Sequence, residues 1–252
     1  MKFTNDEDGV TAMAQYLKEQ ILENNPEQCK INDELISVIF LAWAPWAGKT
    51  EWIESFPDHN SYIILDTDIY RSLFEWYKGS NAWEYQKNAS RVMDKMYSFC
   101  MKEWYNVIVD GTFWNQSKVS ENITKCKKHS RTFSVVLVFQ DPVISFLFTK
   151  KREQEKLRNI PTPAFIEKFF QSIQSVQTVI LEHPDIPVFV SKKLKSEKWY
   201  FDQYIENVQQ FDSLVNLIYS KEELIKLIYE LDQNCKDSSS LNTILWPLIK
   251  PK

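Results

Sequence analysis

The sequence predicts an α/β fold, with helices on both faces of a mostly parallel sheet, and two features lead to this prediction. Apolar runs of strand length alternate with amphipathic segments of helix length from about residue 36 to residue 195. Two of these runs end in glycine turns, Gly48-Lys49-Thr50 and Asp110-Gly111-Thr112, in a chain with only four glycines. Because ligands of such sheets lie beyond the carboxyl ends of the strands, the two turns indicate a candidate site.

The first expected element is a helix, since apolar residues recur at helical spacing over residues 11–23 and Asn24-Asn25-Pro26 ends them. We assign residues 1–35 to an N-terminal helical segment. An apolar strand ending at Trp43 then opens the core. The later elements are expected as a helix after Thr50, a strand at 62–66, a helix at 83–104, strands at 106–109 and 133–139 around a helix at 119–129, helices after Pro142 and at 164–181, and a strand at 186–191.

We expect a core over residues 36–195 and a C-terminal appendage and tail over residues 196–252. Within the appendage, residues 199–205 are candidates for a strand. Ser220, followed three residues later by Glu223, has the spacing of a capping box, which predicts the start of a helix.

Composition limits the class of protein. The chain has 252 residues, of which 44 % are hydrophobic, enough for a sizeable core. A net charge of −4 argues against a broad nucleic-acid footprint. The four cysteines are too scattered for a zinc site. Because the acidic N-terminus lacks an apolar signal core and no apolar run is long enough to span a bilayer, we expect a cytoplasmic protein that does not insert into membranes.

The strand ending at Trp43 leads into a phosphate-binding loop, which predicts a P-loop NTPase type of three-layer fold. Backbone N–H groups of such a loop point at an anion, a lysine reaches the outer phosphates and a hydroxyl holds Mg²⁺. Trp43 and Trp46 stand where the pattern usually has glycine, and a left-handed backbone at Trp46 would cost about 1 to 2 kcal/mol. Because the lysine and the hydroxyl of the pattern are both present, we expect ATP and Mg²⁺ to bind at Pro45, Trp46, Ala47, Gly48, Lys49 and Thr50, with Thr50 as a metal ligand.

Acidic residues follow the next two strands. Asp68 comes just after the strand at 62–66, where it could accept the proton of an acceptor hydroxyl, and Asp66 is the competing candidate for this role. Asp110 closes the strand at 106–109 and is a second candidate ligand for Mg²⁺, although it could instead cap the following helix. Gly111 and Thr112 let the backbone pass close to the substrate.

A basic helix after Pro142, a proline-bounded turn and a second helix indicate a lid at about residues 150–163. Arg152 and Arg158 could hold the β- and γ-phosphates as charge develops during transfer. The alternative is a solvated face of mixed charge, which is what most such runs are.

Together, the loop Ala44–Thr50, the segment Leu65-Asp66-Thr67-Asp68-Ile69-Tyr70-Arg71, the turn Asp110-Gly111-Thr112 and the basic lid resemble the zeta-toxin kinases of bacterial toxin–antitoxin systems. Phage-type polynucleotide 5′-kinases are related to them. The resemblance covers roughly residues 36–195. It implies ATP-dependent phosphorylation of a hydroxyl, which in zeta toxins is the 3′-OH of UDP-N-acetylglucosamine. It also implies that Asp68 is the base, Arg71 orients the acceptor, the lid arginines clamp phosphate, and an antitoxin or regulatory protein is a partner.

Three functions stay open from the sequence. The first is a kinase acting on a nucleotide sugar or a similar small molecule. The second is a 5′-hydroxyl polynucleotide kinase, towards which the lid run Arg158-Asn159-Ile160-Pro161 leans. The third is a nucleotide-binding interaction protein without catalysis, which the two loop tryptophans favour and the presence of both Asp68 and Arg71 disfavours, since binding alone needs neither.

Overall fold

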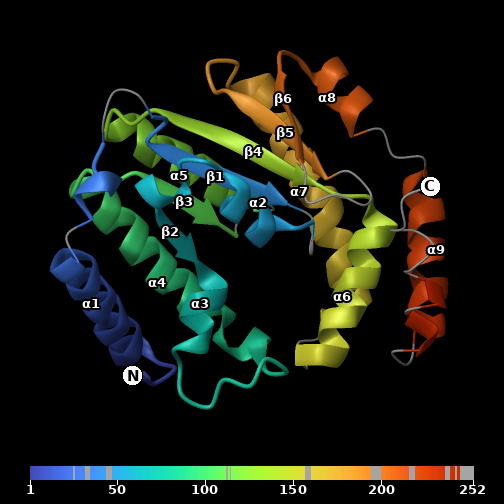
Figure 1. The fold of residues 1–252 in the computed structure, drawn as a ribbon, viewed down its shortest axis with the longest axis horizontal. Helices are drawn as coiled ribbons and strands as arrows, with labels where there is room; N and C mark the ends of the chain where they lie inside the picture. Colours follow the sequence, from blue (N-terminus) through green and yellow to red (C-terminus); the bar gives the residue numbers. More distant parts are fainter. Residues whose placement is uncertain are drawn as a thin grey trace. The chain divides into compact units, whose positions relative to one another are not determined.

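A computed structural model describes residues 1–24, 26–31, 35–43, 47–111, 113, 115–156, 160–193, 200–215, 219–235, 239–241 and 243–244. The helices and strands used below are labelled in Figure 1. In chain order they are α1 (Glu7–Asn24), β1 (Val38–Trp43), α2 (Lys49–Ser55), β2 (Ile63–Asp66), α3 (Thr67–Ser72), α4 (Ala82–Lys102), β3 (Val107–Asp110), α5 (Gln116–Lys128), β4 (Phe133–Phe139), α6 (Pro142–Lys156), α7 (Thr162–Glu182), β5 (Val188–Lys193), β6 (Tyr200–Ile205), α8 (Val208–Leu214) and α9 (Lys221–Asn234).

The strands of the described chain form a sheet in the order β2-β3-β1-β4-β5-β6. β2 pairs with β3 in parallel, as does β4 with β5, whereas β6 runs antiparallel to β5 at the edge. This confirms the predicted α/β fold with a mostly parallel sheet flanked by helices. The strand expected at 199–205 is confirmed, and it extends the sheet rather than standing apart from it.

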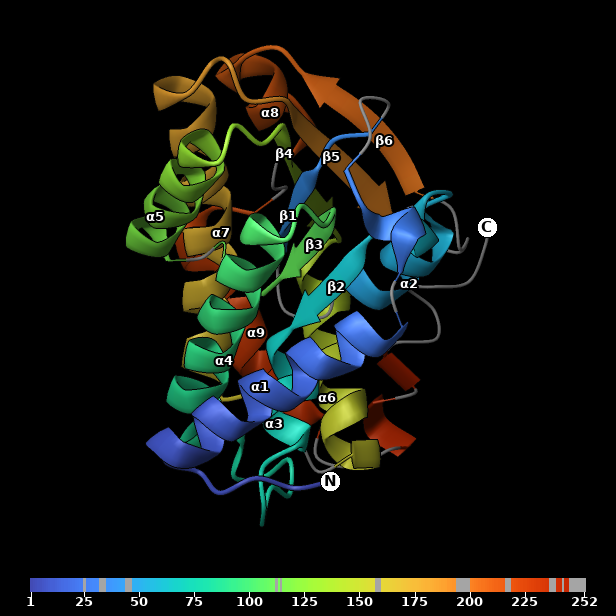
Figure 2. The same ribbon diagram turned by 90° about the vertical axis from the view of Figure 1, so that its left-hand side faces the viewer.

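The contacts divide the chain into two compact units. Unit 1 comprises residues Met1–Phe40, Phe56–Gly111 and Ser120–Ser134. Within it α4 lies against β2 and β3, and both α1 and α3 pack on α4 (Figures 1 and 2). The α4 face that points inwards is apolar at Ala89, Val92 and Met96, each at most 1 % exposed.

Two thiols of unit 1 are fully buried. Cys100 lies on α4 and Cys126 on α5, and the Cys126 Sγ is 3.0 Å from the Tyr97 hydroxyl. Burial raises the pKa of Cys100 to about 12 and that of Cys126 to about 11. Both cysteines are therefore neutral core residues near neutral pH.

Unit 2 comprises residues Leu41–Ser55, Thr112–Val119 and Val135–Lys252. Within it α9 lies beside α6 and also contacts α7, while α8 packs on α7 and β6 (Figure 1). Aromatic rings fill the interior, with the Phe146 and Phe165 centroids 5.2 Å apart. The predicted capping box is confirmed, because the Ser220 hydroxyl accepts from the Glu223 N–H and the Glu223 carboxylate accepts from the Ser220 N–H.

Two short helices, α3 and α8, were not predicted. α3 follows β2 without a connecting loop, so the residues after the predicted strand, which had no assigned element, are helical from Thr67 onwards. In the part of the chain that the structure describes, no helix is long and apolar enough to cross a membrane.

Candidate active site

Asp66 is the last residue of β2 and the N-cap of α3 in unit 1. Its Oδ1 accepts a hydrogen bond of 2.7 Å from the backbone N–H of Asp68. A capping carboxylate satisfies one of the N–H groups that the first turn of a helix leaves without a partner. Asp66 thereby fixes the backbone that presents Asp68.

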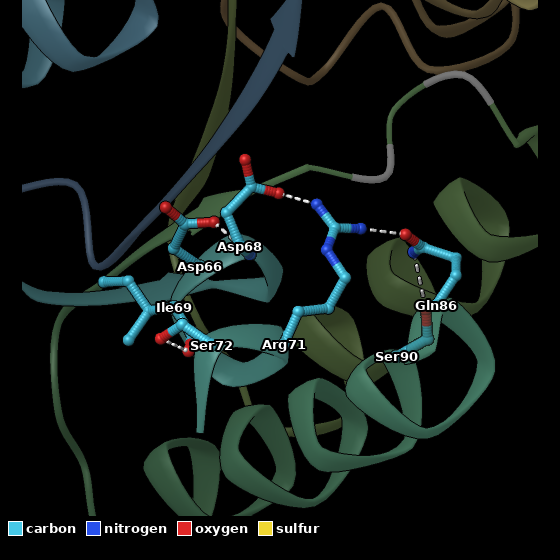
Figure 3. A network of polar contacts seen from close by, with 7 residues as sticks. All are labelled: Asp66, Asp68, Ile69, Arg71, Ser72, Gln86 and Ser90. Carbon is cyan, nitrogen blue, oxygen red and sulfur yellow. Dashed lines mark hydrogen bonds and ion pairs between the residues drawn. The ribbon is translucent and has the colours of Figure 1, made fainter. Parts of the chain in front are cut away.

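Asp68 and Arg71 are three residues apart on α3, a spacing that places their side chains on the same face of the helix. One terminal nitrogen of Arg71 donates to Asp68 Oδ1 and the other donates to Gln86 Oε1 of α4, so the guanidinium lies between them (Figure 3). Gln86 is oriented in turn by a 3.2 Å hydrogen bond from its Nε2 to the Ser90 hydroxyl.

Burial differs across this network. The side chain of Arg71 is only 6 % exposed, whereas that of Asp68 is 32 % exposed. The guanidinium is therefore enclosed by protein, while the carboxylate that it holds stays accessible from solvent. Burial raises the pKa of the neighbouring Tyr70 hydroxyl far above its usual range, which excludes Tyr70 as a base near neutral pH.

Asp110 lies opposite Asp66, because these two residues end the parallel strands β3 and β2 in register. Its side chain is buried, with the residue only 1 % exposed. Gly111 follows with φ +124°, a conformation that L side chains rarely adopt, and a Cβ there would lie 3.2 Å from the Thr67 hydroxyl. A glycine is therefore needed where the chain passes close to the start of α3.

The predicted phosphate loop belongs to unit 2. Gly48 has φ 88°, and Lys49 and Thr50 begin α2, whose first turn closes with a 3.0 Å hydrogen bond from Trp52 N–H to Gly48 O. Trp52 and Ile53 are buried, which anchors the helix. Ala47 is buried as well, while Pro45 and Trp46 lie outside the described residues.

The predicted lid also belongs to unit 2. Asp141 caps α6, since its Oδ1 accepts from Val143 N–H at 2.9 Å and Ile144 N–H at 3.2 Å. Arg152 is half-buried near the end of α6. Arg158 lies outside the described residues, as does Thr112 of the glycine turn.

The structure thus gathers part of the predicted site. Within unit 1 it brings together the β2–α3 junction, with Asp66, Asp68 and Arg71, and the end of β3, with Asp110 and Gly111. Within unit 2 Gly48 directly precedes α2, whose first two residues are Lys49 and Thr50. Sequence reasoning missed Gln86, although its four-residue spacing from Ser90 is a helical pairing signal.

The sequence predicts Mg²⁺ with two protein ligands, Thr50 in unit 2 and Asp110 in unit 1. Among the described residues there is no group of three or more His, Cys, Asp or Glu side chains suited to a metal ion. Mg²⁺ in nucleotide sites needs no such cage, because it keeps waters and takes one or two protein oxygens together with substrate phosphates. The Thr50 hydroxyl and the Asp110 carboxylate are hard oxygen donors of that kind.

Comparison with known proteins identifies a family and several structures with a similar fold. The family model described as zeta toxin matches residues 26–203. A structure titled as the PezAT chromosomal toxin–antitoxin system of the human pathogen Streptococcus pneumoniae has a TM-score of 0.61 at 17 % identity, over 90 % of this chain and 96 % of that chain.

Two structures of the AvrRxo1-ORF1:AvrRxo1-ORF2 complex also share the fold. The one with sulphate ions has a TM-score of 0.65 at 11 % identity, over 94 % of this chain and 84 % of that chain. The one with ATP has a TM-score of 0.60 at 13 % identity, over 92 % of this chain and 84 % of that chain. No curated protein sequence matches the chain significantly.

Proposed function

We propose a function on the premise that the chain belongs to the zeta toxin family: it is an ATP-dependent kinase that phosphorylates a hydroxyl group of a nucleotide sugar or a similar small molecule. The observation that carries this proposal is the ion pair between Asp68 and the buried Arg71, which holds an accessible carboxylate in one orientation. Simple nucleotide binding requires no such base.

Asp68 is the general base in this proposal. As the acceptor oxygen attacks the γ-phosphorus, its hydroxyl proton passes to the Asp68 carboxylate, and the bond between the γ-phosphorus and the bridging oxygen breaks to release ADP. Arg71 and Gln86 hold the carboxylate in place. The resemblance to zeta toxins also assigns Arg71 a part in orienting the acceptor, which we retain as part of this proposal.

The donor side is assigned to the phosphate loop. Backbone groups of residues 45–48 would surround the triphosphate, and Lys49 would neutralise its outer phosphates. Mg²⁺, when bound, offsets the charge on the phosphates, and its protein ligands would be Thr50 and Asp110. Arg152 and Arg158 would clamp the transferring phosphoryl group, and Gly111 and Thr112 would border the substrate. The structure of the AvrRxo1 complex with ATP supports the choice of nucleotide at the level of the fold.

An inhibitory protein partner and a cytoplasmic location complete the proposal. The PezAT structure is titled as a toxin–antitoxin system, and AvrRxo1-ORF1 was solved in complex with a second chain, AvrRxo1-ORF2. A kinase of this type draws on the cellular pool of ATP, which is a reason for it to be held inactive by an antitoxin.

The test is transfer of phosphate from Mg-ATP to pooled nucleotide sugars, and separately to 5′-OH oligonucleotides, detected by mass spectrometry. We expect a sugar-nucleotide product to gain one phosphoryl group, whereas labelling of oligonucleotides alone would favour the polynucleotide kinase. Asp68→Asn should retain Mg-ATP binding and lose roughly 10²- to 10⁴-fold in turnover, the usual contribution of a general base. Asp66→Asn is the matched control and should stay active. If the two variants behave in the opposite way, the base has been assigned to the wrong carboxylate.

A further inference from the structure

The carboxylate of Asp232, near the end of α9, contacts two other elements of unit 2. Its Oδ1 lies 2.9 Å from Lys150 Nζ on α6, and its Oδ2 accepts a 2.5 Å hydrogen bond from the Thr162 hydroxyl at the start of α7. Lys150 is also paired with Glu153, at 2.7 Å. One side chain thus joins three helices.

Both contact residues, Lys150 and Thr162, belong to the predicted lid at about residues 150–163. Lys150 on α6 lies two residues before Arg152, the described arginine that is assigned to the phosphates, and Thr162 is the first residue of α7. Asp232 itself lies beyond residues 26–203, the part of the chain that matches the family model. The contacts of Asp232 with Lys150 and Thr162 therefore come from a helix outside that match.

Asp232 is unfavourable for its own helix. A carboxylate in the last turn opposes the helix dipole, and aspartate is a poor helix former. α9 is already docked by its apolar face, where Leu224 is 1 % and Ile228 is 0 % exposed, and it is capped by Ser220. A residue that breaks a local preference without a local benefit indicates a role elsewhere.

We propose that Asp232 is a positioning residue that fixes the Arg152-bearing end of α6 relative to the start of α7, so that α9 helps to set the position from which Arg152 reaches the phosphates. The proposal rests on the kinase function proposed above. Lys150 and Asp232 have side chains only 15 % and 31 % exposed, so their attraction is less screened than that of a surface pair.

Both groups are charged near neutral pH. Burial alone would lower the pKa of Lys150, but its contacts with Glu153 and Asp232 together raise it. Burial alone would raise the pKa of Asp232, but the hydrogen bonds from Thr162 and Lys150 together lower it. The ion pair between Asp232 and Lys150 is therefore present throughout the physiological range of pH.

The test uses the full chain and the variant Asp232→Asn, which keeps the side-chain size and removes the charge. The matched control is Glu230→Gln on the same helix, at a position with a 57 % exposed side chain. Two quantities are measured: the Kd of Mg-ATP by calorimetry, and the rate of tryptic cleavage after Lys151 and Arg152 by mass spectrometry. We expect Asp232→Asn to raise the Kd roughly three- to tenfold and to accelerate cleavage, with Glu230→Gln unchanged.

A double-mutant cycle separates positioning from general stabilisation. Lys150→Met should raise the Kd of Mg-ATP as Asp232→Asn does, and the double variant should be no worse than either single variant. A fall in thermal stability with Kd and cleavage unchanged would show a merely structural role and overturn the proposal, as would additive effects. A wild-type chain that fails to bind Mg-ATP would refute the proposed kinase together with this role, whereas normal binding that Asp232→Asn leaves unchanged would refute this role alone.

Discussion

The substitution Arg71→Lys should lower turnover without lowering affinity for ATP. Arg71 uses one terminal nitrogen for Asp68 and the other for Gln86. Lysine keeps the charge but carries a single nitrogen, so it cannot make both contacts in the same geometry. A hydrogen bond to a charged group contributes about 1.5 to 3 kcal/mol. If that loss falls on the transition state, kcat decreases roughly 10- to 150-fold.

The assay compares kcat and KM for the acceptor with the Kd of Mg-ATP measured separately. Arg91→Lys is the control, because Arg91 on the neighbouring helix α4 makes the same kind of ion pair, with Glu7, but has a 42 % exposed side chain. We expect Arg91→Lys to have the kcat, the KM and the Kd of Mg-ATP of the wild type. An unchanged kcat in Arg71→Lys, or a loss of ATP affinity as large as the loss of kcat, would refute the idea that Arg71 acts by holding Asp68.

Three further predictions follow from individual residues. Lys49→Ala should abolish ATP binding or turnover, measured by calorimetry and by transfer, since it removes the cation of the predicted phosphate loop. Gly111→Ala should lower the free energy of unfolding by about 1 to 3 kcal/mol in denaturant titrations, because alanine at φ +124° is strained and its Cβ would approach the Thr67 hydroxyl. Cys100 and Cys126 should resist thiol reagents at pH 8, and because burial raises the pKa of each thiol from 9.0, their contribution to stability should be complete below pH 9 and decline as pH rises towards about 11 and 12 in equilibrium unfolding measurements.

Hydrophobic periodicity and capping residues were sufficient to predict most helices and strands of the fold. The long helices α4 and α7 bury residues at helical spacing, and β4 is apolar except at Ser134, so each was predictable from its own segment. The capping box at Ser220 was read from two residue types three positions apart, and both of its hydrogen bonds are present. These features are local, which is why one sequence was enough to find them.

The helix α3 and the contact with Gln86 show where local reasoning stops. α3 has only six residues, too few to display a period, and its main sign is a capping aspartate that looks like the end of a strand. Gln86 meets Arg71 from a separate helix, fifteen residues away in sequence. Such a contact depends on how α3 and α4 pack, so no spacing rule predicts it.

Asp66 and Asp68 have different roles in the structure, although the sequence offered no geometric reason to choose between them. Asp66 accepts the Asp68 N–H and so holds the first turn of α3, while Asp68 projects from that turn and pairs with Arg71. Asparagine caps a helix about as well as aspartate does, so Asp66→Asn removes a charge and keeps the turn. Asp68→Asn, in contrast, removes the proton-accepting group and the ion pair with Arg71 together. A difference in turnover between these two variants would therefore report the chemistry of the carboxylate at Asp68, because the backbone that carries it is the same in both.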